Sequence, residues 1–293
     1  MITASMVKEL RDKTGAGMMD CKKALTETDG DMAKAVDWLR EKGIATAVNK
    51  AGRIAAEGLS KIAISGNHAA IVEINSETDF VAKNDQFLTV LEKVTDAILL
   101  EKPVSVDNAL ELIVDGVTIN DMIIEATATI GEKITLRRFN IITKNDGEEF
   151  GSYTHMGGKI TAIAVVTPEN AAVAKDMAMQ VASMNPLYIS QEVMPAEMVE
   201  HEKEIQLEIM KNNPDDAAKP DNVKEKMLIG RVSKALQDMC LLDQEFFKDT
   251  KVKVGKFLKE SDVTVVKFIR YAVGEGIEKR EENFADEVAN AFK

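Results

Sequence analysis

Residues 59–74 read LSKIAISGNHAAIVEI, and this stretch decides how the middle of the chain folds. Apolar and polar residues alternate in Leu59–Ser65, which predicts a strand, and His68–Ile74 predicts a second, largely apolar strand. Gly66-Asn67 lies between them and favours a tight turn, because both residues adopt the backbone angles that such turns need. The stretch therefore predicts a β-hairpin.

A helix is predicted directly after the hairpin. From about Asn84 onward, apolar residues recur at the spacing that places them on one helix face. These residues are Phe87, Leu88, Leu91, Val94 and Ile98. From Pro103 on, the sequence predicts a further helical region, a helix over Thr118–Ile130 closed by Gly131, and a strand over Ile134–Ile141. We expect residues 58–144 to form one α+β subdomain.

The hairpin-and-helix pattern recurs more weakly later in the chain. Its parts are, in order, Gly151–His155, a turn at Gly157-Gly158, a strand at Ile160–Val166, a helix from about Glu169 to Met184, and a strand at Val263–Tyr271. Either the two α+β halves arose by duplication, or a common structural unit occurs twice. The second half would comprise residues 145–185 and 241–275.

The two halves differ in the join between strand and helix. In the second half the join is the short segment Thr167–Asn170, whereas in the first half it is the longer Ser76–Lys83. A duplicated scaffold needs only the short join, so the longer one is a candidate functional segment.

The first 43 residues predict a compact unit of helices. The expected helices have apolar faces at Met6, Val7 and Leu10, then at Met18, Cys21 and Leu25, and then at Met32, Ala35, Val36 and Leu39. Gly15 and Gly43 are expected to end the first and third of them. Such a short segment buries only a small core, which is typical of a binding module. Residues 44–57 are interpreted as a linker.

Residues 186–240 interrupt the second half. A charged helix over Ala196–Met210, a polar tip over Lys211–Pro220 and a returning helix through Val223 and Met227 predict an antiparallel helical hairpin that forms an arm. At the C-terminus, residues 276–293 are expected to form a helical module with an amphipathic helix over Glu281–Lys293.

Charge and composition exclude several classes of function. The chain has 37 basic and 49 acidic residues, so its net charge is −12. Such a chain repels phosphate, and direct binding to nucleic acid or to a membrane surface is not expected. Cys21 and Cys240 are far apart and fit a reducing, cytoplasmic location. The histidines, His68, His155 and His201, lack the spacing of metal ligands, so no metal and no cofactor are expected.

Enzyme motifs are also missing. Gly157-Gly158-Lys159 lacks the upstream glycine and the following hydroxyl of a phosphate-binding loop. Gly274-Glu275-Gly276 lacks the last glycine of a dinucleotide-binding fingerprint. The sequence therefore predicts a protein that performs no covalent chemistry.

Within the longer join, Asp79-Phe80-Val81 places an acid beside a large apolar side chain. In one interpretation Phe80 covers the helix face formed by Phe87 and Leu91, and residue type alone favours this one. In the other, Phe80 protrudes as an anchor for a protein partner, because aromatic residues provide much of the binding energy at protein interfaces.

Four segments together resemble the bacterial elongation factor Ts family. They are LRDKTGAGMMDCKKAL at 10–25, ETDFVAKN at 77–84, GSYTH at 151–155 and VGEGIEK at 273–279, in the order that the family has them. The resemblance implies an N-terminal ubiquitin-associated-like domain, a duplicated α+β core, an antiparallel coiled-coil arm and a C-terminal helical module. It makes the duplication the better interpretation.

The resemblance also implies a function in translation elongation. Members of the family bind the GTPase elongation factor Tu, in its GDP-bound and nucleotide-free forms, and catalyse exchange of GDP for GTP. Thr78, Asp79, Phe80 and Val81 would face the nucleotide site, where Phe80 is a wedge between helices and Asp79 helps to dislodge Mg²⁺. Further contacts are implied at Lys22, Ile130, Gly131, His155, Phe247 and Lys248. The neighbouring Phe246 leaves the register of the last pair open.

Two questions remain open at this point. The complex could contain one copy of the protein, a dimer, or two copies with two GTPases. The alternative function is that of a ubiquitin-associated-type adaptor or scaffold without exchange activity, which the helical module and the arm would also fit.

Overall fold

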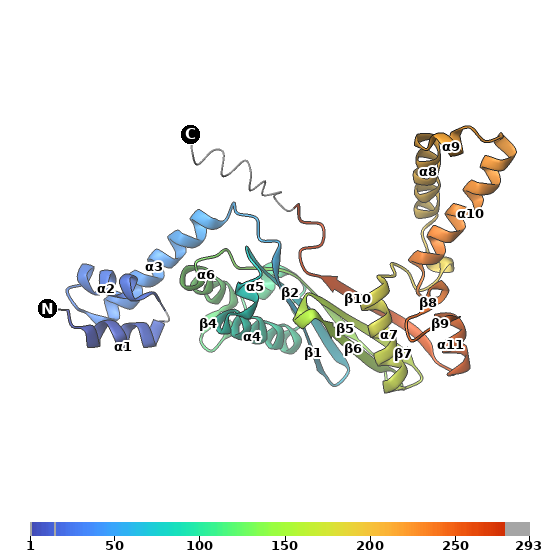
Figure 1. The fold of residues 1–293 in the computed structure, drawn as a ribbon. Helices are drawn as coiled ribbons and strands as arrows, with labels where there is room; N and C mark the ends of the chain where they lie inside the picture. Colours follow the sequence, from blue (N-terminus) through green and yellow to red (C-terminus); the bar gives the residue numbers. More distant parts are fainter. Residues whose placement is uncertain (1, 15, 279–293) are drawn as a thin grey trace. The chain divides into compact units, whose positions relative to one another are not determined.

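The computed structural model describes residues 2–14 and 16–278 (Figure 1). The chain forms two compact units. The first contains the residues up to Thr143, Met156–Ile160 and the residues from Tyr271 onward. The second contains Lys144–His155 and Thr161–Arg270. The described residues do not include the expected C-terminal helix Glu281–Lys293. They also do not include Gly15, the expected end of the first helix. Every helix in the described part of the chain is too short or too polar to span a lipid bilayer.

The N-terminal segment folds into the predicted helices, α1 (Ala4–Thr14), α2 (Met18–Glu27) and α3 (Met32–Lys50). Asp31 caps α3, because its side chain accepts hydrogen bonds from the backbone amides of Ala33 and Lys34, both at 3.1 Å. The buried core of this module consists of Val7, Leu10, Cys21, Ala24, Leu25 and Ala35.

One boundary in this region is wrong in the sequence prediction. Helix α3 continues through Gly43 to Lys50, so residues 44–50 are helical rather than part of a linker. A Cβ atom at Gly43 would lie 3.3 Å from the Cβ of Ala128, and Gly43 is buried. The glycine therefore lies at a close contact between α3 and a neighbouring helix, and α3 continues through it despite the low helix propensity of glycine.

The predicted hairpin is confirmed and forms most of the first sheet. Strands β1 (Glu57–Ser65), β2 (His68–Ser76) and β5 (Thr135–Thr143) pair antiparallel in the order β1-β2-β5. In the hairpin register Ser65 lies opposite His68, and Gly66 in the turn has a φ of +55°. Because the strand order is β1-β2-β5, β2 is the central strand, and its end leads directly into the longer join.

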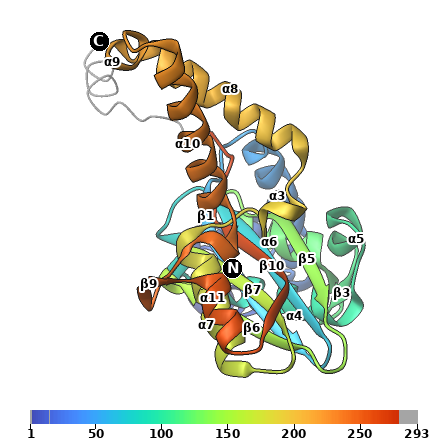
Figure 2. The ribbon, with the colours of Figure 1, turned by 90° about the vertical axis from the view of Figure 1, so that its right-hand side faces the viewer.

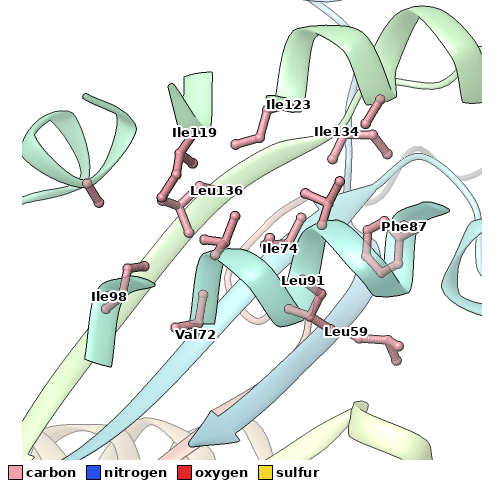
Figure 3. Close-up of a cluster of buried hydrophobic side chains, with 14 of the residues drawn as sticks. Leu59, Val72, Ile74, Phe87, Leu91, Ile98, Ile119, Ile123, Ile134 and Leu136 are labelled. Atoms are coloured by element: carbon pink, nitrogen blue, oxygen red, sulfur yellow. The ribbon is translucent and has the colours of Figure 1, made fainter. Parts of the chain in front are cut away.

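Two helices pack on one face of this sheet. Asn84 caps α4 (Asp85–Glu101), and Gly131, with a φ of +85°, ends α6 (Ile119–Ile130). Their apolar faces meet alternate residues of the strands, as Figure 3 shows for Val72, Ile74 and Leu136. Along the chain, α4 and α6 are separated by α5 (Val106–Leu110) and the short strands β3 (Ile113–Val114) and β4 (Val117–Thr118).

The second unit repeats this arrangement. Its sheet has the order β6-β7-β10, with β6 (Glu149–His155), β7 (Ile160–Thr167) and β10 (Thr264–Ala272), and α7 (Ala171–Met184) follows β7. In both sheets a hairpin is followed by a helix, and a later strand pairs with the second strand of the hairpin. This shared topology favours duplication over chance recurrence.

The arm contains α8 (Ala196–Asn212), α9 (Pro214–Ala217) and α10 (Asp221–Met239), and α10 returns along α8 (Figure 2). The predicted helices of the hairpin are thus present. At its tip the carboxylate of Asp216 accepts hydrogen bonds from Lys219 at 2.9 Å and from Arg231 at 2.7 Å, and these bonds connect α9 to α10. Strands β8 (Glu245–Phe246) and β9 (Asp249–Lys253) and helix α11 (Val254–Glu260) then lead to β10.

Candidate functional site

The longer join is the segment in which the two repeated halves differ most. Residues 77–84 connect β2 to α4, whereas only residues 168–170 connect β7 to α7. We call Glu77–Asn84 the site loop. It contains a short 3₁₀ helix, η1 (Val81–Lys83), and ends at Asn84, whose side chain accepts hydrogen bonds from the amides of Gln86 and Phe87 at 2.9 and 3.2 Å. The loop is thus ordered at its junction with α4.

Phe80 protrudes from the site loop. Phe80 is 81% exposed, while the adjacent Val81 is only 6% exposed and belongs to the core cluster that contains Phe87 and Leu91. Of the two interpretations, the one in which Phe80 covers the helix face of Phe87 and Leu91 is therefore wrong, and the one in which Phe80 protrudes agrees with the structure. Val81 covers it instead, because the helical turn that starts at Phe80 directs successive side chains away from each other.

Asp79 is exposed beside Phe80 and forms no hydrogen bond or ion pair within the described part of the chain. An exposed aromatic ring and an unpaired carboxylate therefore lie next to each other on the surface. This combination can insert an apolar group into a partner and offer negative charge to a cation or to hydrogen-bond donors there.

The backbone of the site loop is held by the turn that follows α6. Thr78 donates two hydrogen bonds to Glu132, from its amide to Oε2 at 2.8 Å and from its hydroxyl to Oε1 at 2.6 Å. In the opposite direction, the amide of Lys133 donates to Oε1 of Glu77 at 2.7 Å. Glu77 and Thr78 thus exchange amide-to-carboxylate hydrogen bonds with Glu132 and Lys133.

This exchange brings together two sets of predicted site residues that are far apart in the sequence. Ile130 and Gly131 directly precede Glu132, so they lie close to Thr78. Ile130 packs partly against the core, and Gly131 is exposed. The sequence analysis did not identify Glu132 or Lys133, and only their position after the glycine that ends α6 could have indicated them.

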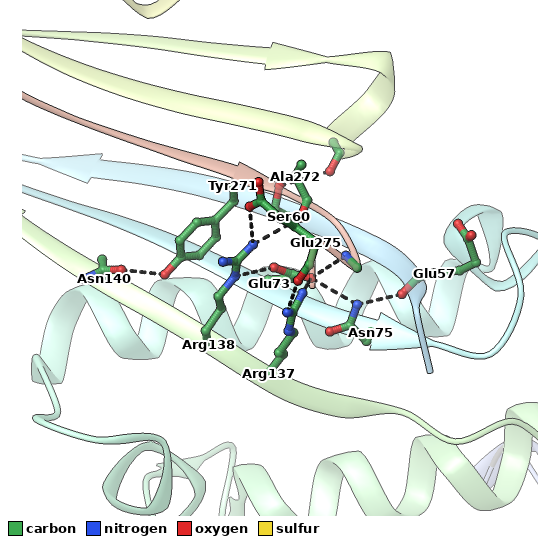
Figure 4. Close-up of polar contacts among 12 residues, drawn as sticks. Glu57, Ser60, Glu73, Asn75, Arg137, Arg138, Asn140, Tyr271, Ala272 and Glu275 are labelled. Carbon is green, nitrogen blue, oxygen red and sulfur yellow. Dashed lines mark hydrogen bonds and ion pairs between the residues drawn. The ribbon is translucent and has the colours of Figure 1, made fainter. Parts of the chain in front are cut away.

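A buried ionic cluster holds the strand that leads into the site loop (Figure 4). Glu73 on β2 is fully buried, and its carboxylate accepts hydrogen bonds from Arg137 at 2.9 Å, Arg138 at 2.6 Å and the amide of Gly274 at 2.8 Å. Burial raises the pKa of Glu73, but these hydrogen bonds outweigh it and hold the pKa below the ordinary value of a glutamate. The cluster therefore keeps Glu73 ionised and ties the segment at Gly274 to the first sheet.

The remaining predicted contact of the first unit, Lys22, is on the N-terminal module. Lys22 is exposed on α2, and its ammonium group forms no hydrogen bond or ion pair within the described part of the chain. A lysine without an internal partner is available to an acidic group on another molecule.

The second unit contains the other predicted contacts. His155 is exposed at the end of β6, with its Nδ1 3.2 Å from the hydroxyl of Tyr153. Phe246 is buried and its ring stacks on Phe257 with 4.2 Å between centroids, whereas the adjacent Phe247 is half-buried. Phe247, not Phe246, is therefore the ring of the doublet that reaches the surface.

Lys248, next to Phe247, forms an ion pair with Asp176 on α7 at 2.5 Å and is itself exposed. Within the described residues no group of three histidine, cysteine or acidic side chains is arranged to hold a metal ion. The exposed candidates are thus an aromatic ring, an acid and several cations or polar groups, and this combination is suited to contacts with another protein.

One comparison with known proteins bears on these observations. A family model described as Elongation factor TS matches residues 77–275, which is more than half of the chain. The match begins at the first residue of the site loop and ends at Glu275, directly after the amide that donates to Glu73.

Proposed function

The chain belongs to the elongation factor Ts family, and from this premise we propose that it binds elongation factor Tu and accelerates the exchange of GDP for GTP. The observation that supports this function best is the exposed Phe80 beside the unpaired Asp79 on a loop whose backbone is held in place. The family implies a translation factor that exchanges nucleotides and does no covalent chemistry. The partner and the contacts below are part of our proposal.

Phe80 is proposed to insert between helices of the GTPase close to its nucleotide site. An exposed aromatic ring gains free energy when a partner buries it, and it loses little side-chain entropy because it has only two rotatable bonds. Asp79 would enter the same region with negative charge, which competes with the phosphates for Mg²⁺ and repels them. Val81 contributes by packing in the core and fixing the turn, not by direct contact.

Exchange then follows from thermodynamic linkage. If the factor binds the nucleotide-free GTPase more tightly than the GDP-bound form, GDP must bind the complex more weakly by the same ratio. Each tenfold loss of GDP affinity requires about 1.4 kcal/mol of differential contact. A single aromatic anchor contributes about 2 kcal/mol or more at a protein interface, so one short loop is sufficient for a large effect.

The other predicted residues would extend the interface. We propose contacts at Thr78, Lys22, Ile130, Gly131, His155, Phe247 and Lys248. In this proposal the N-terminal module corresponds to the family's ubiquitin-associated-like domain and the helical arm to its coiled coil. The site of action is the cytoplasm, and the complex contains one or two copies of each protein.

Stopped-flow release of a fluorescent GDP analogue from elongation factor Tu tests the function directly. The protein should accelerate release, and excess Mg²⁺ should reduce the acceleration, because Mg²⁺ stabilises the state that the site loop disturbs. An adaptor without exchange activity would bind the GTPase and leave the release rate unchanged. That result would contradict the proposal.

A further inference from the structure

We propose that Glu132 is a positioning residue that holds the site loop in the conformation in which Phe80 protrudes. The inference rests on the proposed exchange function and adds to it a residue that lies outside the loop itself. Glu132 would act through Thr78 and not by contact with the partner.

The geometry of the contact supports this role. Both carboxylate oxygens of Glu132 are used, one by the amide of Thr78 at 2.8 Å and one by its hydroxyl at 2.6 Å. Neither donor of Thr78 has another acceptor within the described part of the chain. A two-point contact to a charged acceptor fixes the orientation of Thr78 as well as its position, which a single bond does not.

The position of Thr78 in the loop makes this contact effective. Thr78 is two residues before Phe80, and Val81 is anchored in the core on the other side. On the strand side the hydroxyl of Ser76 donates to the carbonyl of Thr78 at 2.8 Å. Asp79 and Phe80 are therefore the residues between two fixed points. Without Glu132 the first fixed point would lose both of its bonds to the turn after α6.

Loss of this contact should slow exchange without removing any group from the interface. A loop that is ordered before binding pays less conformational entropy when the complex forms. We expect Glu132→Ala to reduce the acceleration of GDP release by about tenfold. Glu132→Gln should keep most of the activity, because its amide oxygen can accept from the Thr78 amide and its amide NH₂ can donate to the Thr78 hydroxyl.

A double-mutant cycle with Phe80 separates positioning from direct contact. If Glu132 acts by presenting Phe80, the variant Glu132→Ala/Phe80→Ala should release GDP at nearly the rate of Phe80→Ala alone. Glu101→Ala is the matched control, since Glu101 is an exposed glutamate at the end of α4 without a partner in the described part of the chain. It should exchange like the unmodified protein.

A second readout needs no GTPase. Hydrogen exchange of the Thr78 amide in the free protein should be slow, and it should become faster in Glu132→Ala while the melting temperature changes little. Should Glu132→Ala fold poorly, Thr78→Val tests the same contact, because it lacks only the hydroxyl that donates to Glu132. Hydrogen exchange of the amide at position 78 should then become faster in the free protein, where no contact with the GTPase contributes.

The outcomes distinguish this inference from the function on which it rests. If the unmodified protein fails to accelerate GDP release, the proposed function is wrong, and the Thr78 amide still reports whether Glu132 holds the loop. If the unmodified protein is active but Glu132→Ala exchanges equally fast, or if its loss adds in full to that of Phe80→Ala, the positioning role is wrong.

Discussion

Phe80 and Val81 are adjacent in the sequence, yet their side chains lie in opposite environments. Phe80 is 81% exposed, whereas Val81 is 6% exposed and packs in the core of the first sheet and its helices. The turn that begins at Phe80 produces this separation. Substitutions at the two positions should therefore affect different properties of the protein, namely binding at Phe80 and stability at Val81.

Phe80→Ala should impair exchange and leave the fold intact. The ring makes little contact within the protein, so its removal should change the free energy of unfolding by less than about 0.5 kcal/mol. Loss of an aromatic anchor of about 2 kcal/mol should slow GDP release in the complex by roughly 30-fold. Stopped-flow fluorescence and thermal melting measure the two effects.

The control for Phe80 is an equally exposed apolar residue outside the site loop. Leu100 on α4 is 72% exposed, and Leu100→Ala should exchange nucleotide at the unmodified rate. Equal losses in Leu100→Ala and Phe80→Ala would show that general surface hydrophobicity, not the placement of Phe80, accounts for the effect.

Val81→Ala should show the opposite pattern. Removal of two buried methyl groups loses transfer free energy and leaves a small cavity, so we expect a loss of about 2 kcal/mol in the free energy of unfolding. Urea denaturation measures this loss. At a temperature where the variant is fully folded, it should retain more exchange activity than Phe80→Ala, and a more severe loss of activity would point to direct contact by Val81.

Lys22→Ala should weaken association with the GTPase. The ammonium group of Lys22 has no partner within the described residues, so its charge is available to an acidic group on the GTPase. We expect a several-fold lower association rate at low salt and a smaller difference at high salt, because charges at the edge of an interface act mainly on association. Lys8→Ala, an exposed lysine on α1, is the control and should leave the rate unchanged.

Glu73 should make the stability of the protein sensitive to acid. Its pKa is lowered in the folded state, so its contribution is fully present above the pKa of the unfolded chain and is lost as the pH falls through the folded value. The free energy of unfolding should therefore decline as the pH falls below about 4. Denaturation with urea at a series of pH values measures the decline.

The matched variant is Glu73→Gln. It should cost about 3 kcal/mol at pH 7, because Arg137 and Arg138 lose the buried charge that they share. Between neutral and acidic pH its stability should change less than that of the unmodified protein. If the free energy of unfolding fell equally with pH in the two proteins, carboxylates other than Glu73 would be responsible for the acid sensitivity.

Two glycines should respond in opposite directions to alanine. At Gly151 a Cβ would lie 1.8 Å from the carbonyl oxygen of Ala174, so the backbone of β6 or α7 must move, and we expect a loss of about 3 kcal/mol. Gly230 lies within α10 with open space around it, so Gly230→Ala should stabilise the arm by about 1 kcal/mol. Melting temperatures of the two variants provide the comparison.

Local sequence patterns predicted the secondary structure correctly where tertiary packing favoured the same conformation. The hairpin, the helix that Asn84 caps and the helix that Gly131 ends all follow from turn and cap residues and from apolar periodicity. Gly43 shows the limit of such patterns. The same residue type that ends α6 lies inside α3, where a Cβ would come within 3.3 Å of the Cβ of Ala128.

The position of the candidate site was predictable from the sequence, but residue type alone did not predict the orientation of its side chains. A longer join in one of two similar halves indicated the segment that contains Asp79 and Phe80. Residue type favoured a buried Phe80, and the structure shows Val81 in that position. Glu132 was not predictable, because its contact with Thr78 connects residues far apart in the chain and no local pattern records it.

Local sequence patterns were enough to predict the order of helices and strands, the family to which the chain belongs and the segment in which we propose that its function is concentrated. These properties depend on residues close together in the chain, where periodicity, caps and turns act. The tertiary structure decided which of two neighbouring side chains protrudes, which glutamate holds the loop and how the buried Glu73 keeps its charge. Those outcomes depend on the burial of groups that only the folded chain brings together, and burial sets the free energy of exposing a ring or ionising a carboxylate.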